Sequence, residues 1–196
     1  MKTGHFSTHA PHVVQSQIAS GDTLGIAVFE GASNTGGTVA LSSQLNIDNN
    51  TVSQNSLGVF VSLYAFSATA TQTGQMNNNS VTSNGFGTVA SESAAGVSFF
   101  DSASQAGVAI QTFNLVGNQI SGNTTNGILT KASGTGATQT VTLAGGNHIN
   151  ANTGFGLYLL NSLIAPATVT VHINSNDLSG NSSGTTHTAG AITLTP

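Results

Sequence analysis

The sequence predicts a single all-β domain in which short strands coil into a solenoid. Two features support this fold class: one segment recurs at a step of about 29 residues, and apolar residues alternate with polar ones within short runs. Ser, Thr, Asn and Gly make up nearly half of the chain, a composition that is also typical of disordered linkers. However, 38% of the residues are hydrophobic and they recur in register, so we expect a folded chain.

The near absence of charge excludes several functions. Only 4% of the 196 residues are charged, there is no arginine, and the two lysines are Lys2 and Lys131. Binding to a nucleic-acid backbone needs clustered basic residues, so we expect no nucleic-acid partner. There is no cysteine to form a disulfide or to ligate a metal. The apolar runs are too short for a membrane-spanning helix, so we expect no membrane insertion.

Six segments align on one apolar position, and this alignment defines the repeat. The steps between successive segments are 34, 29, 39, 29 and 29 residues, and we interpret the longer steps as loop insertions. The aligned residues are Ile18, Val52, Val81, Ile120, Ile149 and Leu178.

Asparagines stand at two fixed offsets from that position in five of the six segments. Stacked coils place equivalent residues about 4.8 Å apart, so we expect each set to form a hydrogen-bonded ladder of side-chain amides. Asparagine also tolerates the left-handed backbone of a tight corner. A row of ligand-binding amides is the alternative. The first set is Asn50, Asn79, Asn118, Asn147 and Asn176, and the second is Asn55, Asn84, Asn123, Asn152 and Asn181.

Each coil is expected to contain three short strands separated by two asparagine corners. The first strand ends in alternating residues, as at 169–173, the second carries the aligned apolar residue, and a glycine opens the third. Isolated strands of this length are unstable in water, so the coils must stack. The pattern gives about six coils of roughly 29 residues over residues 13–196, after a flexible segment at residues 1–12. The opening glycines are Gly25, Gly58, Gly87, Gly127 and Gly156.

The motif Asn-x-Ile-x-x-Asn followed by Gly-Ile-x-Val resembles right-handed parallel β-helix repeats of the pectate-lyase-like superfamily. Within that superfamily it is most similar to the solenoid passengers of bacterial surface proteins and autotransporters. The resemblance covers Val13 to Leu194 and implies a single-stranded right-handed parallel β-helix. It implies no single function, since the superfamily includes pectate lyases, polygalacturonases, tailspikes, adhesins and structural stalks.

Two glutamates and one lysine form the only catalytic candidates. The resemblance implies that an enzyme would use clustered aspartates with basic residues, or a calcium site with a basic residue, and the chain has no arginine for that role. Glu30 and Glu92 each lie five residues beyond their glycines, and Lys131 lies four beyond its own, which predicts a shared ridge. Acid–base work on a glycan is one interpretation of this ridge. A solvated ridge with one weak ion pair is the other, and we favour it.

The longest insertion, between Ala90 and Ala106, provides the binding candidates Phe99, Phe100 and Asp101. Aromatic residues beside small polar ones can stack on sugar rings or pack against the solenoid, and we favour packing. His5, His9 and His12 could meet on a helix to hold a metal, but Pro11 and the flanking Gly and Ser disfavour that helix. We therefore expect no metal and no cofactor.

The expected function is structural, at the cell surface or outside the cell, without catalytic activity. The strand-like pattern at residues 190–196 leads us to expect either a segment of a longer stalk or adhesin, or a subunit that stacks end to end into a filament. The expected partners are copies of the chain, neighbouring coils of a longer chain, or surface glycans. The alternative function is a polysaccharide-binding or polysaccharide-degrading β-helix.

Overall fold

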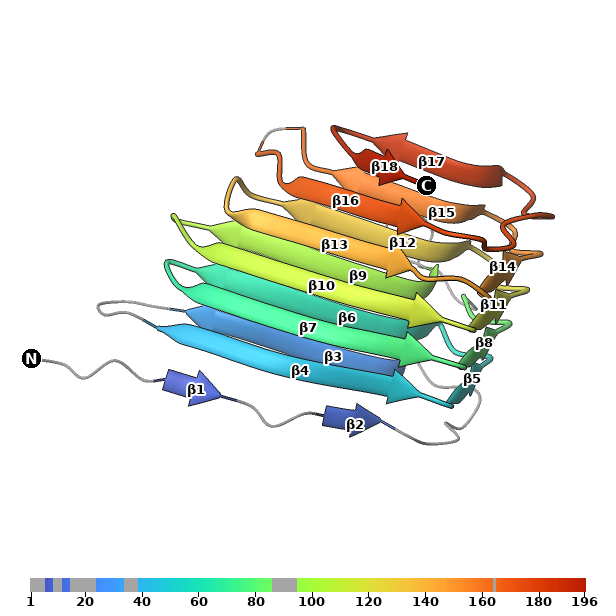
Figure 1. The fold of residues 1–196 in the computed structure, drawn as a ribbon, viewed down its shortest axis with the longest axis horizontal. Coiled ribbons are helices and arrows are strands. Elements are labelled where there is room, and N and C mark those ends of the chain that lie inside the picture. Colours follow the sequence, from blue (N-terminus) through green and yellow to red (C-terminus); the bar gives the residue numbers. More distant parts are fainter. Residues whose placement is uncertain (1–5, 9–11, 15–23, 34–38, 86–94, 164) are drawn as a thin grey trace, which may run out of the picture.

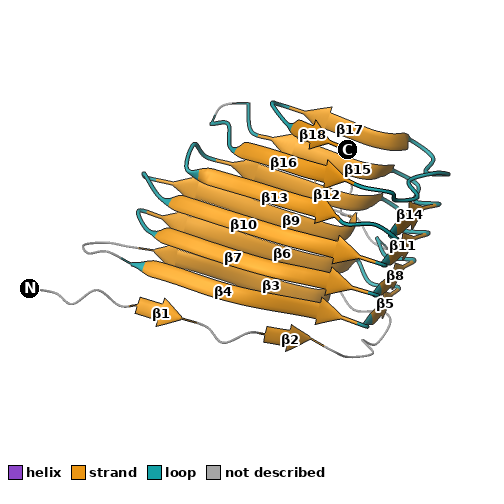
Figure 2. Cartoon of the chain, viewed as in Figure 1, coloured by secondary structure: helices purple, strands orange, loops and turns teal. Residues whose placement is uncertain are grey.

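The computed structural model shows an all-β parallel solenoid of about five turns. It describes residues 6–8, 12–14, 24–33, 39–85, 95–163 and 165–196. Every described element is a strand (Figure 2). The predicted fold class is therefore confirmed, with a slightly smaller number of turns than the six expected. The count falls because the segment around Ile18 lies outside the described residues, and the segment around Leu178 forms a single bridge instead of a strand.

Three parallel sheets form the walls of the solenoid (Figure 1). Sheet A contains β1 (Phe6–Thr8), β2 (His12–Val14), β4 (Ala40–Asp48), β7 (Thr69–Asn77), β10 (Val108–Val116), β13 (Ala137–Leu143), β16 (Thr168–Ile173) and β18 (Thr193–Thr195). Sheet B contains β5 (Thr51–Ser53), β8 (Ser80–Thr82), β11 (Gln119–Ser121) and β14 (His148–Asn150). Sheet C contains β3 (Leu24–Ser33), β6 (Leu57–Phe66), β9 (Ala95–Ser104), β12 (Asn126–Ser133), β15 (Phe155–Asn161) and β17 (Gly184–Ala189).

Each turn runs through sheet C, then sheet A, then the short sheet B, so β3, β4 and β5 make one turn and β6, β7 and β8 the next. The strands of neighbouring turns pair in parallel and in register, as Val52 does opposite Val81. At the amino-terminal end, β1 and β2 both pair with β4. Residues 6–8 of the segment predicted to be flexible are thus placed along the edge of sheet A.

The core is a set of apolar rows that follow the solenoid axis. One of these rows is the aligned position of the repeat. Its residues are paired in register on neighbouring strands of sheet B and are fully buried: Val52, Val81, Ile120 and Ile149. Another row contains Phe99, whose ring lies 4.7 Å from that of Phe113 on the facing sheet. Burial of these rows between three sheets is the main stabilising term for strands too short to persist alone.

Both predicted asparagine ladders are present. In each ladder the side-chain Nδ2 of one asparagine donates to Oδ1 of the next, and the backbone N–H of the same residue donates to that Oδ1 as well. The bonds of the first ladder range from 2.8 to 3.0 Å between side chains, as between Asn118 and Asn147. Those of the second reach 3.2 Å, as between Asn84 and Asn123. Buried amides that are this fully paired fix the register of each turn on the next.

The ladder asparagines were expected to have the left-handed backbone of the corners, but the residues just before them have it instead. This position has positive φ in every turn, at Asn49, Asn78, Gly117, Gly146 and Ser175 for the first corner. The second corner has the same geometry at Gln54, Ser83, Gly122, Ala151 and Gly180. The left-handed residue turns the chain, so that the following asparagine can point its amide into the solenoid.

A row of glycines lies at the start of the sheet C strands, at a position where no side chain fits. A Cβ at Gly127 would lie 2.5 Å from the side chain of Ile149 and 2.9 Å from the amide nitrogen of Asn152, so the row lies directly against the second ladder. In the third turn this position is occupied by Gly96, which lies between Gly58 and Gly127 in register. The expected residue, Gly87, lies outside the described residues.

Candidate functional site on the outer face of sheet C

The predicted ridge of Glu30, Glu92 and Lys131 is not a single ridge. Glu30 points into the solenoid, where Ser43 and Gln72 donate hydrogen bonds to its carboxylate. Lys131 lies on the outer face of the same sheet, with its Nζ 6.0 Å from the centre of the Phe100 ring. Side chains alternate between faces along a strand, so offsets of five and four residues from the glycine row lead to opposite faces. Glu92 lies outside the described residues.

Glu30 ends a third amide ladder, which was not predicted from the sequence. Gln139 donates to Gln111, Gln111 donates to Gln72, and Gln72 donates to Glu30, at 2.8 to 2.9 Å. A carboxylate suits this end of the chain of bonds because it accepts without presenting an N–H of its own. The glutamine ladder is not evident in the sequence because its steps are 39 and 28 residues. The step of 28 residues does not match the 29-residue repeat. The structure therefore gives Glu30 an internal structural role.

The three binding candidates divide between the two faces of β9. Phe99 is fully buried in the core, as the favoured packing interpretation expected, and Asp101 is 1% exposed. Phe100 lies between them on the outer face and is partly exposed. Of the three side chains, only that of Phe100 is placed to meet a ligand outside the solenoid.

Asp101 is a buried acid without a hydrogen-bond partner for either carboxyl oxygen in the described structure. Its removal from water raises the pKa of Asp101 to about 8. The backbone N–H groups of Thr138 and Ser102 lie nearby without reaching hydrogen-bond geometry, and they offset only part of this rise. The buried Oε1 of Gln139 also has no partner in the described residues. A buried carboxyl group without hydrogen-bond partners is far more stable protonated than charged.

Aromatic side chains form a continuous surface on the outer face of sheet C. Phe29 and Phe60 have ring centres 5.2 Å apart, and Phe60 and Phe100 follow at 5.0 Å. Phe29 is 67% exposed. A groove of about 360 Å³ lies along this row and is lined by Leu57, Phe60, Phe100, Asp101, Ser102, Lys131 and Ser133. We call this row and its groove the aromatic face.

A second hollow lies further along the same face, where sheet C meets the corner from sheet B. Tyr158 and His187 stack with ring centres 4.8 Å apart, and Phe155 lies 5.1 Å from His187. The hollow is about 470 Å³ and is lined by Thr124, Thr125, Asn126, Thr153, Gly154, Phe155, Tyr158 and Ser183. It thus combines two aromatic rings with several hydroxyl groups.

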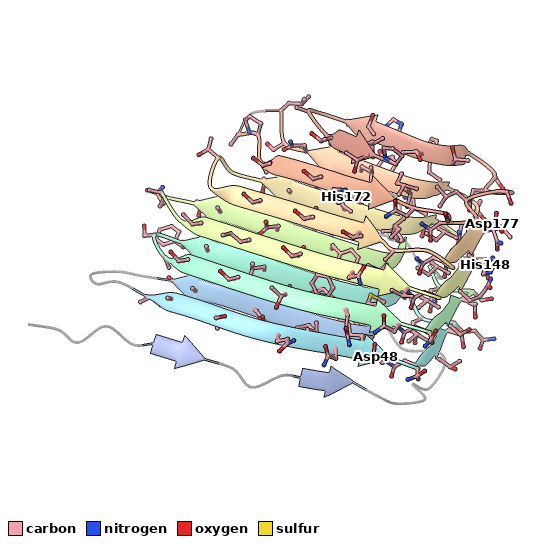
Figure 3. All side chains as sticks on the ribbon, viewed as in Figure 1. Asp48, His148, His172 and Asp177 are labelled. Carbon is pink, nitrogen blue, oxygen red and sulfur yellow. The ribbon has the colours of Figure 1, made fainter. Side chains whose placement is uncertain are left out.

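His148 and Asp177 approach each other at the sheet B corner, with 3.5 Å between His148 Nδ1 and Asp177 Oδ2 (Figure 3). The hydroxyl and backbone N–H of Ser179, helped by Asn150 and His148, hold the pKa of Asp177 well below its ordinary range. Ser179 donates to the aspartate and not to the histidine, so this serine is not activated as a nucleophile. The cluster is a hydrogen-bonded corner.

Comparisons with protein families, curated sequences and solved structures find no match to this chain. Within the described part of the chain, no group of three or more His, Cys, Asp or Glu residues could hold a metal ion. Of the amino-terminal histidines, His12 lies in β2, while His5 and His9 fall outside the described residues. The described part also has no helix long and apolar enough to cross a membrane.

Proposed function

We propose that the chain is a structural β-solenoid that works outside the cell, as part of a stalk, an adhesin or a surface filament. The observation that supports this proposal is the repetition of one cross-section along the axis: each turn presents the next with the same sheet pairing, apolar rows and amide ladders. Further coils can be added to such a structure with the same contacts, because each coil contacts only its neighbours. The proposal keeps the relation to β-helix passengers suggested by the motif, and it includes no catalytic activity.

Low charge supports association of such coils with one another. The formal net charge is −4 over 196 residues, so copies repel each other weakly. Among the described residues, sheets A and C end in β18 and β17, and each of these strands pairs with one neighbour. A strand with one open side is a template for another parallel strand.

Negative-stain microscopy over a range of protein concentrations tests this assembly. We expect fibres of uniform width at high concentration. Leu194→Pro, in β18, removes a backbone donor from the sheet edge and should leave single particles, while Leu163→Pro in an exposed loop serves as the control. Single particles of the unchanged chain at every concentration would contradict a filament subunit.

The aromatic face favours a second candidate function, the binding of surface glycans. Aromatic rings that are exposed or partly exposed and spaced by about one coil can stack on successive sugar rings, and Lys131 adds a positive charge beside Phe100. On a glycan array we expect binding that Phe60→Ala weakens by about tenfold, which corresponds to the loss of one ring contact of about 1.4 kcal/mol. Tyr64→Ala, at an exposed aromatic residue of β6 that does not line the groove, is the control. Equal binding by both variants would argue against the aromatic face.

A further inference from the structure

Threonines stand at alternate, outward-facing positions on three strands of sheet A, β7, β13 and β16. Thr69, Thr71 and Thr73 point outward from β7, whereas Ala70 and Gln72 between them are buried. The same alternation occurs in β13, with outward Thr138, Thr140 and Thr142, and in β16, with outward Thr168 and Thr170. Short side chains of this kind cover the front of the solenoid in Figure 3.

Parallel register aligns these threonines into rows across the strands. The central row contains five threonines on five successive strands. The neighbouring row contains three threonines, one serine and one isoleucine, and it also ends in threonines. Neither row has a charged or aromatic side chain from β7 onward. The central row is Thr73, Thr112, Thr140, Thr170 and Thr193, and the second row is Ser42, Thr71, Ile110, Thr138 and Thr168.

The two rows form a rectangular grid. Neighbouring strands lie about 4.8 Å apart, and alternate residues of a strand lie roughly 6.6 Å apart. The amide ladders inside the solenoid hold the strands in strict register, and side-chain ladders of this kind oppose the twist of a sheet. Threonine has few χ1 rotamers in a strand, so its hydroxyl and methyl groups are held in place before any ligand arrives.

We propose that this threonine face binds ice. The oxygen atoms on the prism plane of an ice crystal repeat along two perpendicular directions, with spacings close to those of the grid. Hydroxyl groups on such a grid can take the places of water oxygens in the ordered layer and form hydrogen bonds there. The uncharged methyl groups between them favour ordered water at the surface. Val108, Ile110 and Val116 continue the face along β10 with β-branched side chains and are 36 to 40% exposed. The inference goes beyond the proposed structural role and does not depend on it.

The chemistry of the face favours ice over a solid polysaccharide. Sugar rings are recognised by aromatic stacking, and the row of Phe29, Phe60 and Phe100 lies on sheet C instead. A charged ligand is disfavoured because the two rows carry no charge. An uncharged grid of hydroxyl and methyl groups in register instead matches an extended crystalline water surface.

Partition of the purified chain into slowly grown ice tests the proposal, together with the thermal hysteresis of its solution. We expect enrichment of the unchanged chain in the ice fraction and measurable hysteresis. Thr112→Lys, at an exposed position in the centre of the main row, should abolish both. Thr73→Lys, on the neighbouring strand, gives an independent second variant.

Thr51→Lys is the matched control, because Thr51 is an exposed threonine on the outer face of sheet B and the change in charge is the same. It should partition into ice like the unchanged chain. Circular dichroism confirms that each variant is folded. Exclusion of the unchanged chain from ice would overturn the proposal, as would full activity of both Thr112→Lys and Thr73→Lys. Binding to solid cellulose or chitin that these variants abolish, without entry into ice, would also overturn it.

Discussion

Replacement of Asp101 by asparagine is expected to stabilise the protein above neutral pH. In the folded chain burial raises the pKa of Asp101 to about 8, whereas an ordinary aspartate has a pKa of 3.8. Between these two values the folded state keeps a proton that the unfolded state releases. The stability that depends on this proton is fully present below about pH 4 and is lost as the pH rises through about 8. The loss is on the order of 5 kcal/mol over this window.

Urea unfolding of both chains at several pH values measures this effect. The free energy of unfolding of Asp101→Asn should exceed that of the unchanged chain at pH 8 and above, and the two should converge near pH 4. Asp48→Asn changes the net charge equally at an aspartate that accepts hydrogen bonds from Asn77 and Gln75, and it should not reproduce the gain. A constant difference between Asp101→Asn and the unchanged chain at all pH values would contradict a buried, protonated Asp101.

Replacement of Asn118 by leucine is expected to cause the largest loss of stability among single substitutions in the ladders. Asn118 donates to the carbonyl of Met76 and to Oδ1 of Asn147, and it accepts from the backbone and side chain of Asn79. Leucine has a similar size but makes none of these bonds. The backbone N–H of Asn79 and the carbonyl of Met76 would each lose this buried partner, at about 1 to 3 kcal/mol per group. We therefore expect a loss of roughly 3 to 6 kcal/mol.

Asn114→Leu provides the control for this substitution, since Asn114 is exposed on β10 in the same turn. Its effect should stay within about 0.5 kcal/mol, as is usual for surface positions. Chemical unfolding of the two variants gives the comparison directly. Similar stabilities for Asn118→Leu and Asn114→Leu would show that the ladder contributes little beyond the apolar rows.

The repeat was predictable because its residues are constrained locally, turn after turn. Each corner needs a left-handed residue followed by an amide that can reach the same amide in the next turn. This requirement recurs at a step of 29 residues wherever no insertion intervenes, as between Asn118 and Asn147. The apolar position between the two corners, as at Ile120 and Ile149, follows from the same geometry.

The candidate site was predicted less well because its residues are related only through the register between strands. Insertions change the step from one turn to the next, so the glutamine ladder, the aromatic face and the threonine rows do not recur at a constant interval. Glu30 shows a further difficulty, since its partner Gln72 lies on another sheet in the next turn. Whether Phe99, Phe100 and Asp101 can reach a ligand depends on which face of β9 each side chain lies on. A shift of one residue along the strand moves a side chain from the inner face to the outer face.

The sequence by itself determined the solenoid, the two asparagine ladders and the apolar row between them, because these depend on fixed offsets within one coil. Only the tertiary structure decided which side chains from different coils become neighbours. It buried Asp101 without a hydrogen-bond partner, placed Phe60 beside Phe100, and aligned Thr112 with Thr140. The physical reason is that pairing between coils is set by the packing of whole turns, and the lengths of the intervening loops do not reveal it.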